Sequence, residues 1–302
     1  MQKTSIKSFI IAHSKTCDQL DIELIISHVL KKERVFIITH DTLLLTKNQE
    51  ETIKKLCKKR TNGYPLAYIL GEKEFYGRDF KVNEDTLVPR AETEILIDIV
   101  LSFINKKDFS EVLILDIGTG SGIIPITLQK EIPNNITKTI LASDISQKAL
   151  KIAKENADNY NASEITFFDS DLLDNSNLLD ILKKTNCKNL IITANLPYVN
   201  KKIKPDLLKK EESKSLIHEP QIALWSKDDG LAHYKKLLRQ TASLLNELPD
   251  EKTISSFYEI SPEQSQLLTS HIKTVFPNAE ITISKDLAQK DRVLHLNTNH
   301  QT

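Results

Sequence analysis

The stretch Asn195–Tyr198 combines an amide, a proline and an aromatic ring directly after an apolar run. A planar amide or aryl amine is a poor nucleophile because its lone pair is delocalised, but acceptors for its N–H protons can orient the nitrogen and favour the charge that develops there. The Asn195 side-chain carbonyl and the Leu196 backbone carbonyl are such acceptors, Pro197 stiffens the chain, and Tyr198 offers a ring for stacking. The stretch predicts a site for a planar nitrogen nucleophile, although a proline-bearing turn with a core tyrosine has the same pattern.

A glycine loop follows the apolar residues 112–116. Glycines let backbone approach a ligand closely, but a lone G-x-G also fits an ordinary strand-to-helix turn. The carboxyl end of a strand is where doubly wound sheets bind ligands, which favours binding. The third glycine comes too early for a dinucleotide fingerprint, and Asp116 would repel a pyrophosphate. The loop therefore favours a ligand with a cationic group, such as S-adenosylmethionine. The residues expected to hold this cofactor are Gly118, Thr119, Gly120, Ser121 and Gly122.

Two further acids end the next two predicted strands. Asp144 closes residues 139–144, where its carboxylate can accept hydrogen bonds from both hydroxyls of a ribose; an Asp before a helix often interacts only with the helix dipole. Asp171 closes residues 165–171, within reach of an adenine amino group, or is a simple strand-end carboxylate. A glycine loop and two acids on three successive strand ends form the cofactor pattern of a class I methyltransferase.

Strands and helices alternate from Glu111 onward, which predicts a parallel α/β sheet with helices on both faces. The last two strands are close in the chain, so we expect them to pair antiparallel and to close a seven-stranded, doubly wound methyltransferase sheet. Asn195 ends the fourth strand, beside the first strand, which puts it next to the cofactor's sulfonium. Ser146 and Ser261 are expected to cap helices. The predicted strands are residues 112–116, 139–144, 165–171, 190–195, 255–260, 279–284 and 292–297.

The N-terminal part has helical spacing of its apolar residues and no glycine before Gly63. Thr16 with Gln19, and Asn48 with Glu51, have the spacing of capping boxes. These features predict a small N-terminal helical bundle that precedes the sheet. The expected domains are the bundle at residues 1–70, a hairpin-like connection at 71–90 and the methyltransferase domain at 91–302.

Composition narrows the class of protein. The chain of 302 residues carries 41 Lys and Arg against 41 Asp and Glu, so it lacks a bulk cationic field for nucleic acid, while a local basic patch stays open. Three widely spaced cysteines indicate a reducing compartment rather than a disulfide framework. No apolar run approaches the roughly 18 residues of a membrane span. We expect a cytoplasmic protein without a signal peptide and, since His218 has no second histidine at metal spacing, without a metal.

Seven short motifs occur in the order seen in release-factor glutamine methyltransferases, which the chain resembles over nearly its whole length. That family methylates the side-chain amide of the glutamine in the Gly-Gly-Gln motif of peptide chain release factors, with S-adenosylmethionine as the methyl donor. The resemblance implies the same fold and activity here. The motifs are VPRAETEIL (88–96), LDIGTGSG (115–122), ASDIS (142–146), NLPY (195–198), EPQIAL (219–224), DDGLAHY (228–234) and DLAQKDRV (286–293).

The resemblance also implies roles for single residues. Asn195 would touch both cofactor and glutamine, and Asn195, Pro197 and Tyr198 would be catalytic, within a substrate clamp that includes Leu196. The family often has an aromatic residue where this chain has Leu172, which can still pack on adenine. The helical bundle would dock the release factor, because a protein substrate needs a surface that the cleft alone cannot supply.

One departure from the family pattern favours a rival function. The family usually reads Asn-Pro-Pro-Tyr, whereas this chain has Leu196 in place of the first proline. Asn-Leu-Pro-Tyr resembles the motif of ribosomal RNA adenine dimethyltransferases, whose target amine is equally planar. That family typically has a different glycine loop and places its extra helices after the core, and the neutral charge here also disfavours RNA.

A binding module that keeps only the methyltransferase fold is a third alternative, which the intact glycine loop and Asn195 disfavour.

The sequence leaves the location of three residues open. Arg90 and Glu92 either line the cofactor cleft or cap a helix, and Trp225 lies either in the core or in the cleft.

Overall fold

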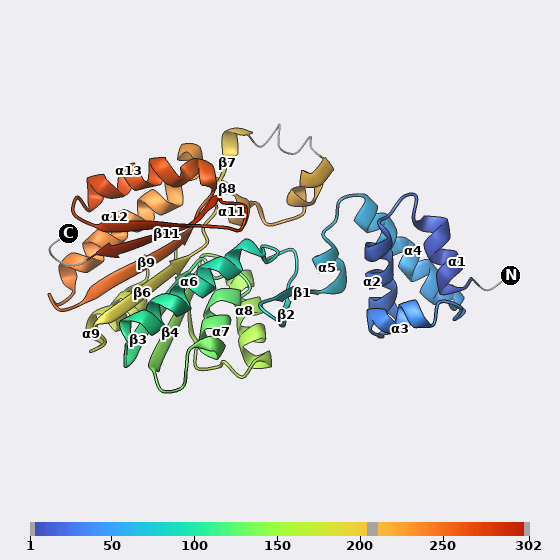
Figure 1. The fold of residues 1–302 in the computed structure, drawn as a ribbon, viewed down its shortest axis with the longest axis horizontal. Helices are drawn as coiled ribbons and strands as arrows, with labels where there is room; N and C mark the ends of the chain where they lie inside the picture. Colours follow the sequence, from blue (N-terminus) through green and yellow to red (C-terminus); the bar gives the residue numbers. More distant parts are fainter. Residues whose placement is uncertain (1–3, 204–210, 299–302) are drawn as a thin grey trace. The chain divides into compact units, whose positions relative to one another are not determined.

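The computed structural model describes residues 4–203 and 211–298, which fall into two compact units (Figure 1). The first, the helical unit, comprises Met1–Glu72 with Asp206–His218. The second, the sheet unit, comprises Lys73–Pro205 and Glu219–Thr302. The first unit therefore takes in a segment that lies far along the chain, after the residues of the Asn-Leu-Pro-Tyr stretch.

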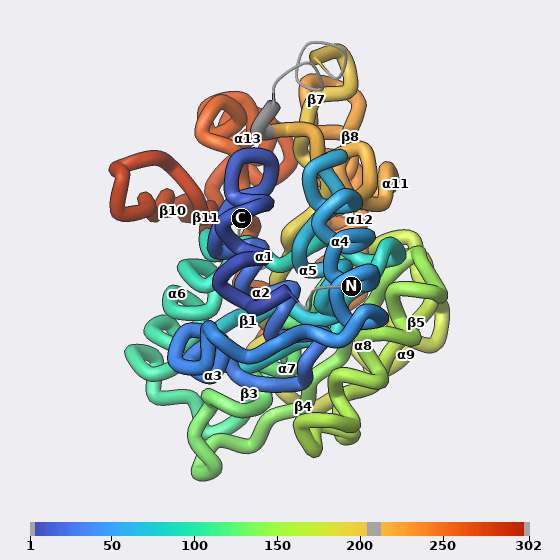
Figure 2. Tube along the Cα trace, turned by 90° about the vertical axis from the view of Figure 1, so that its right-hand side faces the viewer, coloured from blue at the N-terminus to red at the C-terminus, as the bar shows by residue number. Residues whose placement is uncertain are grey.

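The helical unit consists of short helices (Figure 2). Isoleucines make up much of its core. Ile22, Ile25 and Ile26 on α2 are fully buried, together with Phe9 on α1 and Ile53 on α4. Such spacing places the apolar side chains on one stripe of a helix, which must be buried against a neighbour. The helices are α1 (Ile6–His13), α2 (Gln19–Leu30), α3 (Arg34–Thr39), α4 (Lys47–Thr61) and α5 (Leu66–Leu70).

Both predicted capping boxes in the helical unit are wrong by two residues. Asp18, not Thr16, caps α2, because its carboxylate accepts from the N–H groups of Leu20 and Asp21. Thr46 caps α4 in a box with Gln49, so Asn48 lies inside the helix.

The sheet unit contains the predicted seven-stranded sheet, in the order β10-β11-β9-β6-β3-β4-β5. Strands β9, β6, β3, β4 and β5 run parallel, and β11 pairs antiparallel with both β9 and β10. The prediction of a doubly wound sheet with a closing antiparallel pair is confirmed. The strands are β3 (Glu111–Ile117), β4 (Thr137–Asp144), β5 (Thr166–Asp169), β6 (Asn189–Ala194), β9 (Thr253–Glu259), β10 (Glu280–Lys285) and β11 (Asp291–Thr298).

Shorter strands pair outside this sheet. Strand β1 (Glu72–Phe75) pairs with β2 (Arg78–Lys81), within the stretch expected to be hairpin-like. Strand β7 (Val199–Asn200) pairs in parallel with β8 (Trp225–Ser226), directly after the Asn-Leu-Pro-Tyr stretch. The β7–β8 pair joins that loop to the segment that leads into helix α12 (Ala232–Glu247).

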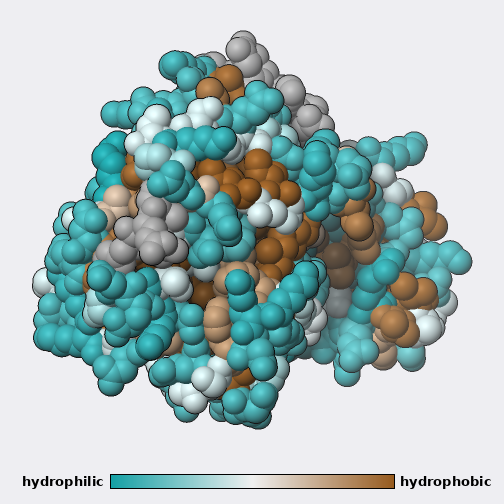
Figure 3. All heavy atoms as spheres, turned by 60° about the vertical axis from the view of Figure 1, so that its left-hand side comes forward, coloured by the Kyte–Doolittle hydropathy of each residue, from teal (hydrophilic) through white to brown (hydrophobic). Residues whose placement is uncertain are grey.

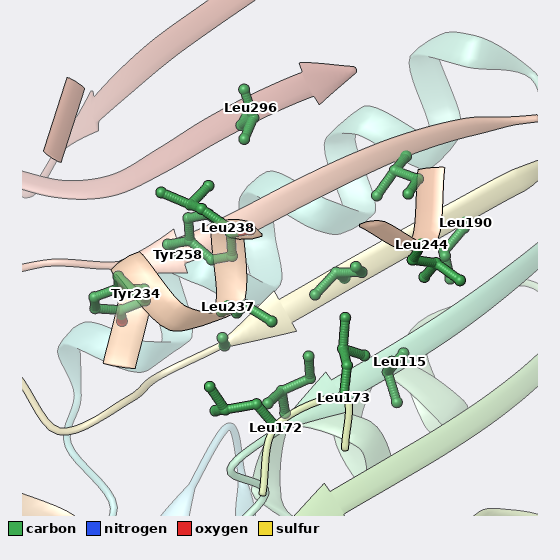
Figure 4. Close-up of a cluster of buried hydrophobic side chains, with 14 of the residues drawn as sticks. Leu115, Leu172, Leu173, Leu190, Tyr234, Leu237, Leu238, Leu244, Tyr258 and Leu296 are labelled. Carbon is green, nitrogen blue, oxygen red and sulfur yellow. The ribbon is translucent and has the colours of Figure 1, made fainter. Parts of the chain in front are cut away.

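Helices cover both faces of the sheet (Figure 1). Alternate residues of β3 enter two separate cores: Ile114 packs with α6, α7 and α8, and Leu115 packs with α9, α12 and α13. Figure 4 shows Leu115 with leucines and Tyr234 of α12 in the second core. The helices are α6 (Glu92–Lys107), α7 (Ile123–Glu131), α8 (Gln147–Asn159), α9 (Ser176–Lys184), α11 (Gln221–Leu224), α12 (Ala232–Glu247) and α13 (Ser265–Val275), with 3-10 turns η1 (Lys201–Ile203), η2 (Glu211–Ile217), η3 (Asp228–Gly230) and η4 (Pro262–Gln264).

Polar side chains cover most of the face drawn in Figure 3, with apolar residues exposed between them. Among the described residues, no helix combines the length and the apolar character needed to cross a membrane. Within the same residues, no three His, Cys, Asp or Glu side chains are grouped as metal ligands would be. The cysteines at positions 17, 57 and 187 are buried and free of disulfides.

Candidate active site

A cleft of about 370 Å³ opens at the carboxyl ends of β3, β4 and β6 in the sheet unit. Its volume lies within the range of small-molecule pockets. Most residues predicted from the sequence line it; Gly122 and Tyr198 are not among the lining residues. The predicted residues that line the cleft are Gly118, Thr119, Gly120, Ser121, Asp144, Asp171, Leu172, Asn195, Leu196 and Pro197.

The glycine loop is held by the backbone and the acid of the neighbouring strand. The N–H of Gly118 donates to the Ser143 carbonyl at 2.8 Å, and the N–H of Gly120 donates to Asp144 Oδ2 at 2.8 Å. Gly118 has a φ of +73°, and a Cβ there would lie 2.9 Å from the Leu196 Cδ2 atom. A Cβ at Gly122 would lie 3.2 Å from that of Ala153, so this glycine permits close packing of α7 on α8.

Asp116 is a buried acid at the end of β3, with no exposed surface. Its Oδ1 accepts from the Thr193 hydroxyl at 2.7 Å, while its Oδ2 has no hydrogen-bond partner. Burial raises the pKa of Asp116 to about 7, against the lowering effect of hydroxyl hydrogen bonds. The Thr119 hydroxyl adjoins the Asp116 carboxyl, and Thr119 also lines the cleft. Thr119 lines the cleft and Asp116 does not, so of these two side chains the Thr119 hydroxyl is placed to meet the charged amino-acid end of S-adenosylmethionine.

Asp144 ends β4 as predicted and faces the cleft. Its two oxygens accept from the N–H groups of Gly120 and Ser146, each at 2.8 Å. Burial raises the pKa of Asp144, and these backbone hydrogen bonds oppose the rise. A carboxylate has about four lone-pair sites, so capacity for ribose hydroxyls remains. Ile145, which is half exposed and lines the cleft beside Asp144, presents an apolar surface that was not predicted.

Asp171 lies two residues beyond the end of β5, because this strand ends at Asp169 and not at 171 as predicted. Its carboxylate pairs with Lys236 of α12 at 2.6 Å, and both residues line the cleft. Leu172 has a left-handed backbone, with φ of +62°, and is buried between the cleft and the core. The loop after β5 therefore presents an ion pair and an apolar side chain to the cleft.

Asn195 follows β6 directly, and two residues distant in the chain hold its side chain. Its Nδ2 donates to Thr93 Oγ1 at 3.1 Å and to Glu259 Oε2 at 2.9 Å. The Thr93 hydroxyl in turn donates to the same Glu259 oxygen at 2.7 Å. Burial raises the pKa of Glu259 to about 7, against the lowering effect of the Thr93 hydrogen bond. Neither Thr93 nor Glu259 was predicted as a site residue from the sequence. An acid at the end of the apolar strand β9 could have indicated Glu259.

The rest of the Asn-Leu-Pro-Tyr stretch is anchored on the side away from the cleft. The Leu196 N–H donates to Tyr234 Oη at 3.1 Å, and the Tyr234 hydroxyl donates to the Glu259 backbone carbonyl. Tyr198 Oη donates to Glu259 Oε1 at 3.4 Å, and burial raises the pKa of Tyr198. The Tyr198 carbonyl accepts from Gln264 Nε2 at 2.7 Å. The Tyr198 hydroxyl therefore faces the same acid that holds Asn195.

The structure also places the three residues that the sequence left open. Arg90 lines the cleft and pairs with the buried Glu219 at 2.6 Å. Glu92 begins α6 and lies 4.0 Å from Arg292. Trp225 is 8% exposed, and its Nε1 donates to Gln221 Oε1 at 2.9 Å. Arg90 is thus a residue of the cleft, while Trp225 is buried outside its lining.

Comparison with known folds agrees with this architecture. The catalytic domain of human METTL16, in its complex with MAT2A 3′UTR hairpin 1, is similar with a TM-score of 0.54 and 14% identity, over 90% of each chain. At this level of identity the likeness concerns the fold alone. Two family models also match: the PrmC N-terminal domain at residues 6–71 and the methyltransferase small domain at residues 93–184.

Relatives of similar length share about a third of the residues. The chain is 34% identical to the release factor glutamine methyltransferase of Bacillus cereus, over 90% of each chain. It is 33% identical to the protein of the same name from Clostridium botulinum, over 91% of this chain and 90% of the relative. Identity at this level across both units, with the methyltransferase cleft in place, means that the chain belongs to the family of release factor glutamine methyltransferases.

Proposed function

We propose that the protein transfers a methyl group from S-adenosylmethionine to the side-chain amide nitrogen of the glutamine in the Gly-Gly-Gln motif of peptide chain release factors. The names and lengths of its relatives support this substrate. The observation that carries the proposal is the orientation of Asn195, whose amide nitrogen is engaged by Thr93 and Glu259. Its carbonyl oxygen is left for a donor in the cleft, as a planar NH2 group requires.

The cofactor would lie along the glycine loop. Residues of the stretch Gly118–Gly122 would meet it with backbone and with the Thr119 hydroxyl, Asp144 would accept from its ribose, and Leu172 would pack on its adenine. Asp171 would reach the adenine amino group only in competition with Lys236. When bound, S-adenosylmethionine supplies a methyl carbon activated by the adjacent sulfonium.

The Asn-Leu-Pro-Tyr stretch would bind the acceptor glutamine. Asn195 Oδ1 and the Leu196 carbonyl would each accept one N–H of the glutamine amide, which points the nitrogen lone pair at the methyl carbon. These acceptors would also favour the positive charge that develops on the nitrogen as its bond to the methyl carbon forms and the methyl–sulfur bond breaks. Loss of one N–H proton would then give the neutral N-methyl amide and a neutral thioether. Pro197 would keep the Leu196 carbonyl in place, because the residue before a proline is restricted to extended conformations.

Mass spectrometry of an intact release factor tests this function. Incubation with the enzyme and S-adenosylmethionine should add the mass of one methyl group to the Gly-Gly-Gln glutamine. A release factor with Glu in place of that glutamine is the matched control and should gain nothing, because a carboxylate has no N–H. Methyl transfer to ribosomal RNA and not to the release factor, or absence of heat on titration with S-adenosylmethionine, would contradict the proposal.

The helical unit would dock the release factor. It exposes apolar side chains on α3, where Val35 is 66% and Ile38 is 53% exposed. These residues are three apart, so they lie on one face of the helix. Replacement of both by Asp should raise the KM for release factor by about tenfold and leave the Kd for S-adenosylmethionine unchanged. Replacement of both by Ala is the milder control; an unchanged KM in the Asp variant would refute docking at α3.

A further inference from the structure

We propose that Glu259 is a positioning residue for methyl transfer, which fixes both hydrogen-bond acceptors of the substrate clamp, Asn195 Oδ1 and the Leu196 carbonyl. The inference rests on the proposed function. Glu259 ends β9, next to β6 in the sheet, so its side chain meets the residue that follows β6. It is 1% exposed, and its side chain and its backbone carbonyl each make a separate set of contacts.

The side chain of Glu259 determines which way the Asn195 amide faces. The hydroxyl of Thr93 has one proton, which it donates to Glu259 Oε2. When Glu259 is ionised, therefore, both Thr93 Oγ1 and Glu259 Oε2 accept from Asn195. Only the amide nitrogen satisfies two acceptors, so the oxygen must point the other way. A flipped amide would place its oxygen against a carboxylate oxygen at hydrogen-bond distance, which is repulsive.

The backbone carbonyl of Glu259 anchors the second acceptor through Tyr234. The Tyr234 hydroxyl donates to that carbonyl and accepts from the Leu196 N–H. A proline in place of Leu196 has no N–H, so this hydrogen bond depends on the leucine. The bond fixes the peptide before Leu196, and Pro197 restricts the rotation after it. The direction of the Leu196 carbonyl follows from these two constraints, although the chain lacks a proline at 196.

The hydrogen bonds of the Glu259 side chain and its burial indicate that this residue does more than fill space in the core. A carboxylate without exposed surface is costly unless hydrogen bonds compensate, and here the compensating donors are Thr93, Asn195 and Tyr198. Two of these three belong to the proposed clamp. An apolar residue of similar size would fill the same volume without this cost, but it could not distinguish the nitrogen of an amide from its oxygen.

Two substitutions at Glu259 separate positioning from packing. Glu259→Gln keeps a carbonyl oxygen that can accept from Thr93 and Asn195, and its NH2 group can donate to Tyr198 Oη. We expect this variant to keep kcat within about tenfold of the wild type. Glu259→Leu keeps the volume and loses the acceptor, so kcat should fall by about 100-fold or more, with the KM for release factor and the Kd for S-adenosylmethionine within about threefold.

A second pair of variants keeps the test valid if Glu259→Leu does not fold. Thr93→Val removes one acceptor for Asn195 and should lower kcat by about tenfold, whereas Thr93→Ser should recover most of that loss. Glu280→Gln neutralises an exposed acid on β10 and serves as the matched control without effect.

Nuclear magnetic resonance reports the amide orientation directly. The Asn195 side-chain NH2 signal, assigned by its loss in Asn195→Ala, should exchange slowly with solvent in the wild type and faster in Glu259→Leu and Thr93→Val. Equal exchange, or a Glu259→Leu kcat within threefold of the wild type, overturns the inference. An inactive wild type in which that exchange is slow refutes the proposed function but supports the orientation, so the two failures are distinguishable.

Discussion

The two sides of the cleft are built from contacts of different range. On the cofactor side, the glycine loop is held by Ser143 and Asp144, which lie about 25 residues further along the chain on the adjacent strand. On the acceptor side, Asn195 is held by Thr93, 102 residues away, and by Glu259, 64 residues away. The glycine loop and its anchor Asp144 are thus made within one strand-helix-strand unit, whereas the contacts of Asn195 exist only when the whole sheet has formed.

Because of this difference, we expect substitutions on the two sides of the cleft to change different kinetic quantities. Substitutions on the cofactor side should act mainly on the affinity for S-adenosylmethionine. Substitutions on the acceptor side should act mainly on kcat, because orientation of the nucleophile contributes to the transition state and little to cofactor binding.

Asn195→Ala should produce the largest effect. It removes the side-chain acceptor, so kcat for release factor should fall by about 1,000-fold, while the Kd for S-adenosylmethionine stays within about tenfold. Single-turnover kinetics and calorimetry measure the two quantities. A large loss of cofactor affinity, with turnover of the bound fraction intact, would contradict the division between the two sides.

Gly118→Ala should weaken the binding of S-adenosylmethionine. The residue has a positive φ, and the added Cβ would press on the Leu196 side chain at 2.9 Å. We expect the Kd for S-adenosylmethionine to rise by about 30-fold, since the loop must shift away from its ligand-holding conformation. Gly71→Ala is the matched control, because Gly71 has a φ of +81° with no atom within 4 Å. A rise of equal size in the control would show that strain alone is responsible.

Tyr234→Phe should give a smaller loss on the acceptor side. It removes the partner of the Leu196 N–H and leaves two buried backbone groups unpaired, at a cost of about 1–3 kcal/mol in the free energy of unfolding. We expect kcat to fall by about fivefold with the Kd for S-adenosylmethionine unchanged. Denaturant titration and steady-state kinetics check this. Full activity would mean that Pro197 alone holds the Leu196 carbonyl.

Asp116→Asn should change the pH dependence of stability and leave the fold intact. Because burial raises the pKa of Asp116 to about 7, the folded protein holds a proton that the unfolded chain releases. The free energy of unfolding of the wild type should therefore decrease between about pH 4 and 7, by at most about 1.4 kcal/mol per pH unit from this group. The variant should have a flatter profile in urea denaturation at several pH values. If the free energy of unfolding of the variant depends on pH as steeply as that of the wild type, another group titrates in this range.

The sequence predicted the strands and the position of the glycine loop well because their signals are local. Apolar runs marked the strands, the alternating glycines marked the loop, and Asp144 ended the strand it was assigned to. The helix starts were less accurate, because several side chains close together can cap one helix. Thr16 donates its proton to the His13 carbonyl, which leaves Asp18 to cap α2.

The acceptor side shows what only the tertiary structure decided. The sequence by itself determined the parallel sheet, since strands alternate with helices and crossovers are right-handed. The methyltransferase pattern of its motifs indicated that the Asn-Leu-Pro-Tyr stretch lies beside the glycine loop. It did not determine that Glu259 and Thr93 meet Asn195, or that Tyr234 takes the N–H of Leu196. Such hydrogen bonds depend on side-chain directions at the ends of elements that are far apart in the chain, and these directions are fixed only when the two cores have packed.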